Sequence, residues 1–197
     1  MSLEVLNTTA SLLTVTIVAA TAVAALVQLR HLRAGNQTSA LLSVSERLDG
    51  HEFREALTLA NRGLEAALAD PAFRAYVIAI FRRVQPPDAD QRFVDMHNAV
   101  IKVGNAFEIL GVLVKNRVVD AVLFLDAYCS VALGAWKRLE GYTALDRDVT
   151  GDDAMWEHFE YLAVLSEDWI ARHPSSYPKG IRRLQIRNRW PLSSPCG

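Results

Sequence analysis

The feature that most constrains the fold is a run near the N-terminus, from Val5 to Leu29, that contains no charged side chain. As an α-helix, these 25 residues extend for roughly 37 Å, which is enough to cross the roughly 30 Å hydrocarbon core of a bilayer with some tilt. Alanine, valine and threonine dominate the run, so its insertion into a membrane is expected to be favourable by a modest margin. The run predicts one of three segments: a membrane anchor, a signal peptide, or the core helix of a soluble protein.

The residues before and within the run favour the anchor. A signal peptide begins with a positively charged segment, whereas this chain carries Glu4 at that place. Ala22-Val23-Ala24 has the small-residue pattern of a cleavage site, which keeps the signal peptide as an alternative. The core helix of a soluble protein rarely stays uncharged over such a length at the start of a chain. An uncleaved anchor is therefore the preferred interpretation.

The flanks of the run predict its orientation. Arg30, His31 and Arg33 follow it directly, while only Glu4 and the terminal amine precede it. Positive residues beside a span stay on the cytoplasmic side. We therefore expect a single-pass protein of the inner (cytoplasmic) membrane, with its N-terminus outside and the remaining chain in the cytoplasm. Small residues four apart, such as Ala20 and Ala24, are a weak indication of helix pairing in the bilayer.

The rest of the chain has the apolar periodicity of amphipathic helices. The first helix is expected to continue past Gly35 to a break at Asp49-Gly50, and a second is expected from Glu52 to Leu68. Asp70-Pro71 predicts the start of a short third helix. The clearest pattern predicts a bundle helix that Asp88 can cap, with apolar residues at spacings of three and four: Phe93, Met96, Val100, Val103, Phe107, Leu110 and Val114.

Two later segments complete the predicted bundle. Val118 to Trp136 is apolar enough to suggest a second span, but it contains Asp120 and Asp126. Each aspartate costs about 2.5–3.5 kcal/mol near the centre of a span, so a central bundle helix after the turn at 115–117 is the better interpretation. The sequence Thr150-Gly151-Asp152-Asp153 fits a variant of the capping box, which predicts that the last helix starts there and extends to about Arg172.

The predicted fold class is all-α, because no segment shows the sustained alternation of a strand. We expect a long N-terminal transmembrane helix that continues into a cytoplasmic bundle of about five helices. The expected domains are an anchor with a basic flank at 1–33, a helical bundle at 34–173, and a basic tail with prolines and serines at 174–197.

Sequence signatures of catalysis are absent. The chain contains no G-x-S-x-G, P-loop, G-x-G-x-x-G or kinase motif, and its histidines do not follow the H-E-x-x-H spacing. Two cysteines are too few for a disulfide framework or a C-x-x-C metal site. We predict no cofactor, no metal site and no catalytic residue, and we favour a protein that is not an enzyme. Gly104 and Gly111 are expected at positions of close helix packing.

Polar residues in apolar surroundings are the best candidates for a ligand site. Glu108 and Asp126 are each flanked by apolar residues, and burial raises the pKa of a carboxyl group, a perturbation that is frequent at functional sites. If both acids face one crevice between their helices, that crevice is a polar pocket, to which His97 can contribute. A metal site formed by His97, Glu108 and His158 is a weaker alternative. Structural ion pairs or hydrogen bonds are the more common explanation for such residues.

Charge is unevenly distributed near the C-terminus. Tyr142 to Arg172 carries eight acidic residues against two arginines, whereas residues 173–197 carry no acid. The simplest expectation is that the basic tail folds back on the acidic segment. A patch that contacts the membrane surface or a partner is the alternative, and its residues are Arg30, Arg33, Lys179, Arg182, Arg183, Arg187 and Arg189. Nucleic-acid binding by the tail, with Trp190 stacking on a base, is not supported by the net charge of −1.

Several segments of the chain resemble those of a known family. They are QLRHLRAGNQTSALL directly after the apolar run, NAFEILGVLVKNRVVDAVLFLD, and the later W-K-R-L and FEYL motifs. Together they resemble a bacterial family of domains of unknown function made of small, N-terminally anchored helical proteins. The resemblance covers about Gln28 to Leu162 and consists of helix-packing patterns. It implies the same architecture and no assigned activity, so it transfers no catalytic residues.

These observations predict a membrane-tethered helical scaffold or regulatory interaction module. Its expected partners are membrane lipid and either other proteins or further copies of itself. One alternative is a small-ligand-binding protein or enzyme with a polar pocket between the helices that carry Glu108 and Asp126. A second alternative is nucleic-acid sensing through the basic tail.

Overall fold

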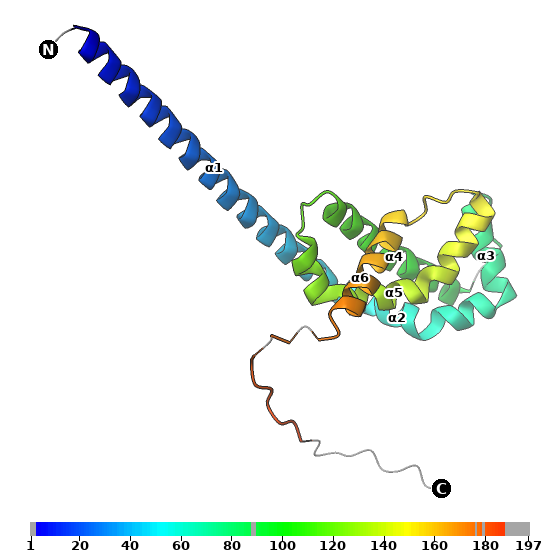
Figure 1. The fold of residues 1–197 in the computed structure, drawn as a ribbon. Helices are drawn as coiled ribbons and strands as arrows, with labels where there is room; N and C mark the ends of the chain where they lie inside the picture. Colours follow the sequence, from blue (N-terminus) through cyan, green and yellow to red (C-terminus); the bar gives the residue numbers. More distant parts are fainter. Residues whose placement is uncertain (1–2, 88–89, 176, 179, 188–197) are drawn as a thin grey trace.

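The computed structural model describes residues 3–87, 90–175, 177–178 and 180–187. Within these residues the chain forms six α-helices and no strand, which confirms the all-α prediction (Figure 1). The helices are α1 (Leu3–Asp49), α2 (His51–Ala69), α3 (Pro71–Phe81), α4 (Gln91–Lys115), α5 (Ala121–Thr150) and α6 (Glu157–Arg172). The long N-terminal helix is followed by a bundle of five, as expected.

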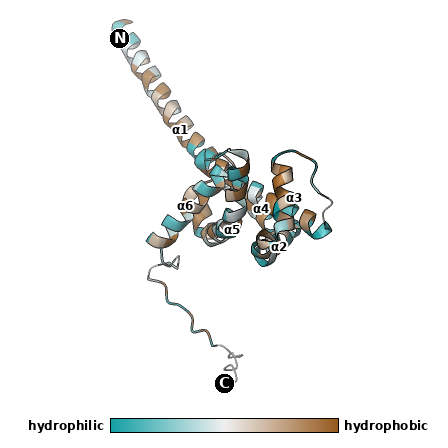
Figure 2. Ribbon diagram, turned by 90° about the vertical axis from the view of Figure 1, so that its right-hand side faces the viewer, coloured by the Kyte–Doolittle hydropathy of each residue, from teal (hydrophilic) through white to brown (hydrophobic). Residues whose placement is uncertain are grey.

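Helix α1 is the longest element and projects from the bundle (Figures 1 and 2). Its 47 residues extend for roughly 70 Å. It passes through Gly35 without a break and ends at Asp49, as the sequence predicts. None of its most apolar window is buried against the rest of the chain. This finding excludes the core helix of a soluble bundle as an explanation for the uncharged run within this chain.

Four threonines of α1 satisfy their hydroxyl groups inside the helix. Thr8, Thr14, Thr16 and Thr21 each donate to the carbonyl oxygen four residues earlier, at 2.8–2.9 Å. A hydroxyl bonded in this way needs no partner outside its own helix. The threonines therefore leave the projecting surface of α1 effectively apolar.

The C-terminal third of α1 enters the bundle. Val44 and Leu48 are almost fully buried, and Ser45 accepts a hydrogen bond of 2.8 Å from the Tyr128 hydroxyl of α5. Closer to the projecting part, the Gln37 amide donates to the Arg117 carbonyl oxygen at 3.5 Å. One helix is thus exposed and apolar in its first part and packed into the core in its last part.

Helix α4 supplies the centre of the core, packed against α2, α5 and α6. The predicted apolar face is buried except for Phe93, which is half-buried. Phe107 has no exposed surface; its ring meets Phe53 of α2 edge to face at 5.8 Å and stacks on Phe159 of α6 at 4.8 Å. The 3-4 periodicity therefore identified the core-facing side of α4 correctly.

Helix α5 is a bundle helix rather than a second span. It buries Phe124, Ala132 and Leu139 in the core, and α1 is the one described helix long and apolar enough to cross a membrane. Asp120, which looked like a charge inside the apolar segment, is the N-cap of α5 and accepts from the backbone of Val122 and Leu123. The prediction of a bundle helix at this place is confirmed.

Aspartates cap the N-termini of α3 and α4. Asp70 accepts from Ala72 N at 2.8 Å and caps α3 as expected. For α4 the N-cap is Asp90, which accepts from Arg92 N at 2.9 Å and directly precedes the first helical residue. Asp88, the predicted cap, lies outside the described residues.

The predicted start of the last helix is wrong. Thr150 is the last residue of α5, and Gly151, with φ +69°, ends that helix in the left-handed conformation typical of a helix C-terminus. The Thr150 hydroxyl donates to the Asp146 carbonyl, inside α5, and accepts from Asp152 N. A threonine followed by a glycine fits a start or an end equally well, and here it marks the end. Helix α6 begins later, at Glu157.

Candidate functional site

The N-terminus of α6 lacks a cap of its own and receives one from α4. Trp156 occupies the N-cap position at φ +53° and makes no side-chain cap hydrogen bond. Instead, Oε2 of Glu108 accepts from the backbone N–H groups of His158 at 3.0 Å and Phe159 at 2.9 Å. A carboxylate at this place satisfies two orphan donors and complements the positive end of the helix dipole. Glu108 therefore joins two helices 50 residues apart in sequence.

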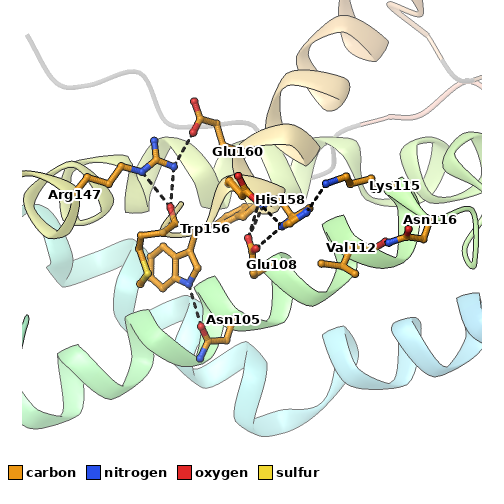
Figure 3. A network of polar contacts seen from close by, with 12 residues as sticks. Asn105, Glu108, Val112, Lys115, Asn116, Arg147, Trp156, His158 and Glu160 are labelled. Atoms are coloured by element: carbon orange, nitrogen blue, oxygen red, sulfur yellow. Dashed lines mark hydrogen bonds and ion pairs between the residues drawn. The ribbon is translucent and has the colours of Figure 1, made fainter. Parts of the chain in front are cut away.

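A chain of three side chains extends from this cap (Figure 3). Oε1 of Glu108 lies 2.7 Å from Nδ1 of His158, and Nε2 of His158 lies 2.9 Å from Nζ of Lys115. A lysine ammonium group only donates, so Nε2 accepts and Nδ1 carries the proton that is given to Glu108. The Lys115–His158–Glu108 arrangement thus orients the imidazole and connects the end of α4 to the start of α6.

Two glycines of α4 allow this close approach. A Cβ atom at Gly111 would lie 2.1 Å from the His158 carbonyl oxygen, and one at Gly104 would lie 2.0 Å from the Trp156 ring. Neither distance is sterically possible without movement of α6. The prediction that both glycines are close-packing positions is confirmed.

Further polar contacts fix the connection between α5 and α6 (Figure 3). The Trp156 indole donates to Oδ1 of Asn105 at 3.0 Å. The Arg147 guanidinium donates to the Met155 carbonyl at 2.8 Å and to Glu160 at 2.7 Å. These contacts and the Glu108 cap together hold the segment between α5 and α6, in which Trp156 has a positive φ. Most of this network was not predicted, because its residues are unremarkable in the sequence.

The structure does not bring Glu108 and Asp126 into one pocket. The carboxylate of Glu108, a residue of α4, lies at the start of α6. Asp126 is exposed and lines a groove beside Trp169 and His173, at the end of α6. Since α6 has 16 residues, its two ends are roughly 24 Å apart. The predicted crevice shared by both acids is therefore not formed, and Glu108 has a structural role.

His97 belongs to a different cluster, between α3, α4 and α5. Its Nδ1 lies 2.6 Å from the Tyr142 hydroxyl, and its ring meets Tyr76 edge to face at 6.2 Å. Burial raises the pKa of Tyr142 far above its usual range, with a further contribution from Asp146, so this hydroxyl keeps its proton. Burial lowers the pKa of His97 and favours its neutral form. The structure thus pairs Glu108 with His158 and leaves His97 apart.

Asp146 is a buried acid that the sequence did not single out. It is 7% exposed, and burial raises the pKa of its carboxyl group, a shift that its hydrogen bond with Thr150 opposes. Its sequence neighbours are largely polar, so no apolar context marks it. Within the described part of the chain, no group of three or more histidine, cysteine, aspartate or glutamate side chains is arranged to hold a metal ion.

The predicted basic contact residues fall into two groups. Arg30 and Arg33 are exposed on α1, directly after the uncharged run. Arg182, Arg183 and Arg187 are exposed on an extended segment that leads away from the bundle (Figure 1). Lys179 and Arg189, like Trp190, lie outside the described residues.

The described part of the tail lies beside the C-terminal end of α6 but makes its polar contacts within itself. Arg183 stacks over the Tyr177 ring at 4.8 Å and donates to the Ser175 hydroxyl at 2.7 Å, both within the tail. Among the residues that the structure describes, no tail arginine forms an ion pair with α6. The charges of α6 are paired instead with residues of the bundle, as in the ion pair of Arg147 with Glu160.

Comparison with known proteins identifies one similarity. Residues 15–169 match the family described as "Domain of unknown function (DUF4760)". No curated protein and no solved structure matches the chain. The match confirms the resemblance to a family of domains of unknown function. It also extends beyond the segments that suggested it and includes the second half of the uncharged run.

Proposed function

Since the chain belongs to the DUF4760 family, whose description assigns no activity, we infer its function from its architecture and propose a membrane-tethered interaction module. In this proposal α1 is a single-pass anchor, and the bundle of α2 to α6 is a scaffold or regulatory domain held at the membrane surface. Its partners are the lipids around α1 and either other proteins or further copies of this chain.

One observation carries the proposal: the first part of α1 is apolar, helical and exposed on every side. Its exposed large apolar side chains are Leu12, Leu13, Val15, Ile17, Val18, Val23, Leu26, Val27 and Leu29. Burying each such side chain is worth about 1.5–3 kcal/mol, so their joint exposure to water is strongly unfavourable. A bilayer removes this cost, and the helix satisfies its own backbone and threonine hydroxyl groups there.

The proposed orientation depends on the residues that follow the span. Arg30 and Arg33 are exposed at the point where the uncharged run ends. Positive residues that flank a span favour the cytoplasmic side, which places the bundle in the cytoplasm and the N-terminus outside. The membrane in this proposal is the inner, or cytoplasmic, membrane.

The bundle has features that suit an interaction module. Its internal polar residues serve to hold the fold together: Glu108 of α4 bonds to His158 of α6, and Tyr142 of α5 bonds to α4. A groove between α2 and α4 combines small apolar residues with charges of both signs, and it is open to solvent for a partner. Its residues include Glu52, Arg54, Ala56, Leu59, Ala99 and Lys102.

Fractionation without detergent tests the anchor. We expect the wild-type chain in the membrane fraction and resistant to extraction by salt or alkaline carbonate. Val18→Arg places a charge near the middle of the span at a cost of about 2.5–3.5 kcal/mol and is expected to release the chain from the membrane. The matched control is Leu59→Arg, at an exposed position of α2, which leaves the distribution unchanged. Recovery of the wild-type chain in the soluble fraction at low salt would rule out the anchor.

The two alternative functions gain no support from the geometry. The acids proposed to share a pocket lie at opposite ends of α6. Nucleic-acid binding by the basic tail stays a prediction. A titration of RNA and DNA binding against salt concentration checks it, because phosphate contacts weaken steeply as salt rises.

A further inference from the structure

We propose that the turn between α4 and α5 is a second point of contact with the membrane and that it binds anionic lipid headgroups. The turn consists of Lys115, Asn116, Arg117 and Val118, all of them exposed. This inference rests on the proposed anchor, because α1 determines where the membrane surface lies. Its occupant is the bilayer that holds α1.

The position of the turn follows from its contact with α1. The Arg117 carbonyl accepts from Gln37, eight residues after the last residue of the uncharged run. Eight residues of helix correspond to a rise of about 12 Å, and the headgroup layer of one leaflet is roughly 5–8 Å thick. For a span close to the membrane normal, the backbone of Arg117 therefore lies about 4–7 Å beyond the headgroups. That distance is shorter than the Debye length of roughly 8–10 Å near physiological salt.

From this turn, α5 leads away from the membrane alongside α1. A second contact joins Tyr128 of α5 to Ser45 of α1. From the first contact to the second, the residue numbers rise in both segments, so α5 and the last part of α1 lead away from the membrane in the same direction. Asp120, the acid nearest to the turn, is occupied as the N-cap of α5, and the next acid, Asp126, lies close to the second contact along the helix. The turn is thus the part of α5 and its preceding loop that is closest to the bilayer.

Charge complementarity identifies anionic lipid as the ligand. Arg30 and Arg33 on α1 and Lys115 and Arg117 on the turn give four exposed cationic side chains around the membrane end of the bundle. Three acids lie next to this group of cations, Glu46, Glu108 and Asp120, and two of them have partners: Glu108 caps α6 and bonds to His158, and Asp120 caps α5. The Lys115 ammonium group lies 2.9 Å from Nε2 of His158, and the side chain is exposed. Each basic residue near an anionic membrane surface strengthens binding by roughly fivefold.

Val118 adds an apolar group to the turn. It is 47% exposed and directly follows Arg117, so a probe at this position reports how close the turn comes to the headgroups. Val118 N donates to the Leu113 carbonyl and Arg117 N to the Val114 carbonyl, the hydrogen-bond pattern of a Schellman motif. Arg117 occupies the left-handed position of this motif, at φ +58°, where glycine is usually preferred.

A second turn in the same molecule offers a matched control. Helix α3 ends in the same motif, with Arg83 at φ +56° and Val84 donating to the Ala79 carbonyl. Val84 is 56% exposed, similar to Val118. Helix α3 lies on the side of the bundle away from α1 (Figures 1 and 2). The two turns therefore share an Arg-Val pair and its backbone geometry, and in the proposed arrangement they differ in their distance from the membrane.

The experiment measures how close each valine comes to lipid in the full-length chain. Val118→Cys and Val84→Cys are made in a background with Cys129→Ser and Cys196→Ser, and each is labelled with a fluorophore. The labelled chains are reconstituted in vesicles of phosphatidylcholine with or without phosphatidylglycerol, and quenching by headgroup spin-labelled lipid is recorded. Flotation of the vesicles tests the anchor separately, so a chain that does not float contradicts the proposed function rather than the turn.

We expect several-fold stronger quenching at position 118 than at position 84 in vesicles with phosphatidylglycerol. The difference should shrink without the anionic lipid, at about 1 M salt, where the Debye length is about 3 Å, and in the Arg117→Gly background. Arg117→Gly removes the charge and relieves the backbone, so the fold is retained, whereas Arg83→Gly should leave the difference unchanged. Equal quenching at both positions, or a signal at 118 that is indifferent to anionic lipid and salt, would overturn the inference.

Discussion

At the scale of single residues, Glu108 shows how one carboxylate replaces a missing local signal. It accepts two backbone hydrogen bonds at the start of α6 and a third from His158, although it belongs to α4. The sequence marked Glu108 as unusual because of its apolar neighbours. The sequence could not show which groups bond to the Glu108 carboxylate, because they lie 50 residues away in the chain.

Replacement of Glu108 is expected to destabilise the bundle. Glu108→Ala leaves two N–H groups of α6 without a cap and should lower the free energy of unfolding by about 1–2 kcal/mol. Glu108→Gln keeps an acceptor for the backbone but not for His158, and should cost less. Urea denaturation followed by circular dichroism measures both. The control is Glu65→Ala, at an exposed position of α2, for which a change within about 0.5 kcal/mol is expected. Equal effects of Glu108→Ala and Glu65→Ala would contradict the capping role.

At the scale of helices, the sequence predicted a boundary or a buried face wherever the helix itself contains the capping residue or the apolar spacing. Asp70-Pro71 marks the start of α3, and the 3-4 spacing of α4 predicts its buried face. The boundary between α5 and α6 was not predictable in this way. Gly151 ends one helix, and the next begins at a residue without a local cap, because Glu108 caps it from a neighbouring helix. Tertiary contacts of this kind leave no pattern in the local sequence.

Helix α1 packs into the bundle through one face of its last turns. Leu48 is 5% exposed in the core, whereas Leu42 on the same helix is 61% exposed. Leu48→Ala should lower the free energy of unfolding by about 2–5 kcal/mol, while Leu42→Ala should have little effect. Thermal unfolding of the two variants in detergent or vesicles measures the difference. Similar melting temperatures for both would show that α1 does not pack into the bundle through its last turns.

At the scale of the whole molecule, the sequence predicted the number of helices and the long N-terminal element, and the structure confirms both. The arrangement of polar residues between helices was not predictable, because it depends on which faces meet. Glu108 and Asp126 illustrate this limit: both have apolar neighbours, yet one is a cap and the other is exposed.

The proposed orientation is tested by cysteine accessibility. In the background without native cysteines, Leu3→Cys and Leu184→Cys place single thiols at exposed positions at the two ends of the described chain. With the N-terminus outside, a membrane-impermeant maleimide should label Leu3→Cys in intact spheroplasts and Leu184→Cys only after lysis. The opposite labelling pattern would reverse the topology, and labelling of both before lysis would indicate leaky spheroplasts and require a lysis marker as a control.

The continuity of α1 couples the angle of the bundle to the thickness of the bilayer. Helix α1 passes from its exposed apolar part to the buried Leu48 without a break, so no hinge separates the two parts. A thinner bilayer makes a long apolar helix tilt further. The bundle must then lean by the same angle and bring one side of its surface nearer to the lipids. In the proposed membrane arrangement, a change in lipid composition would therefore change which face of the bundle a partner can reach.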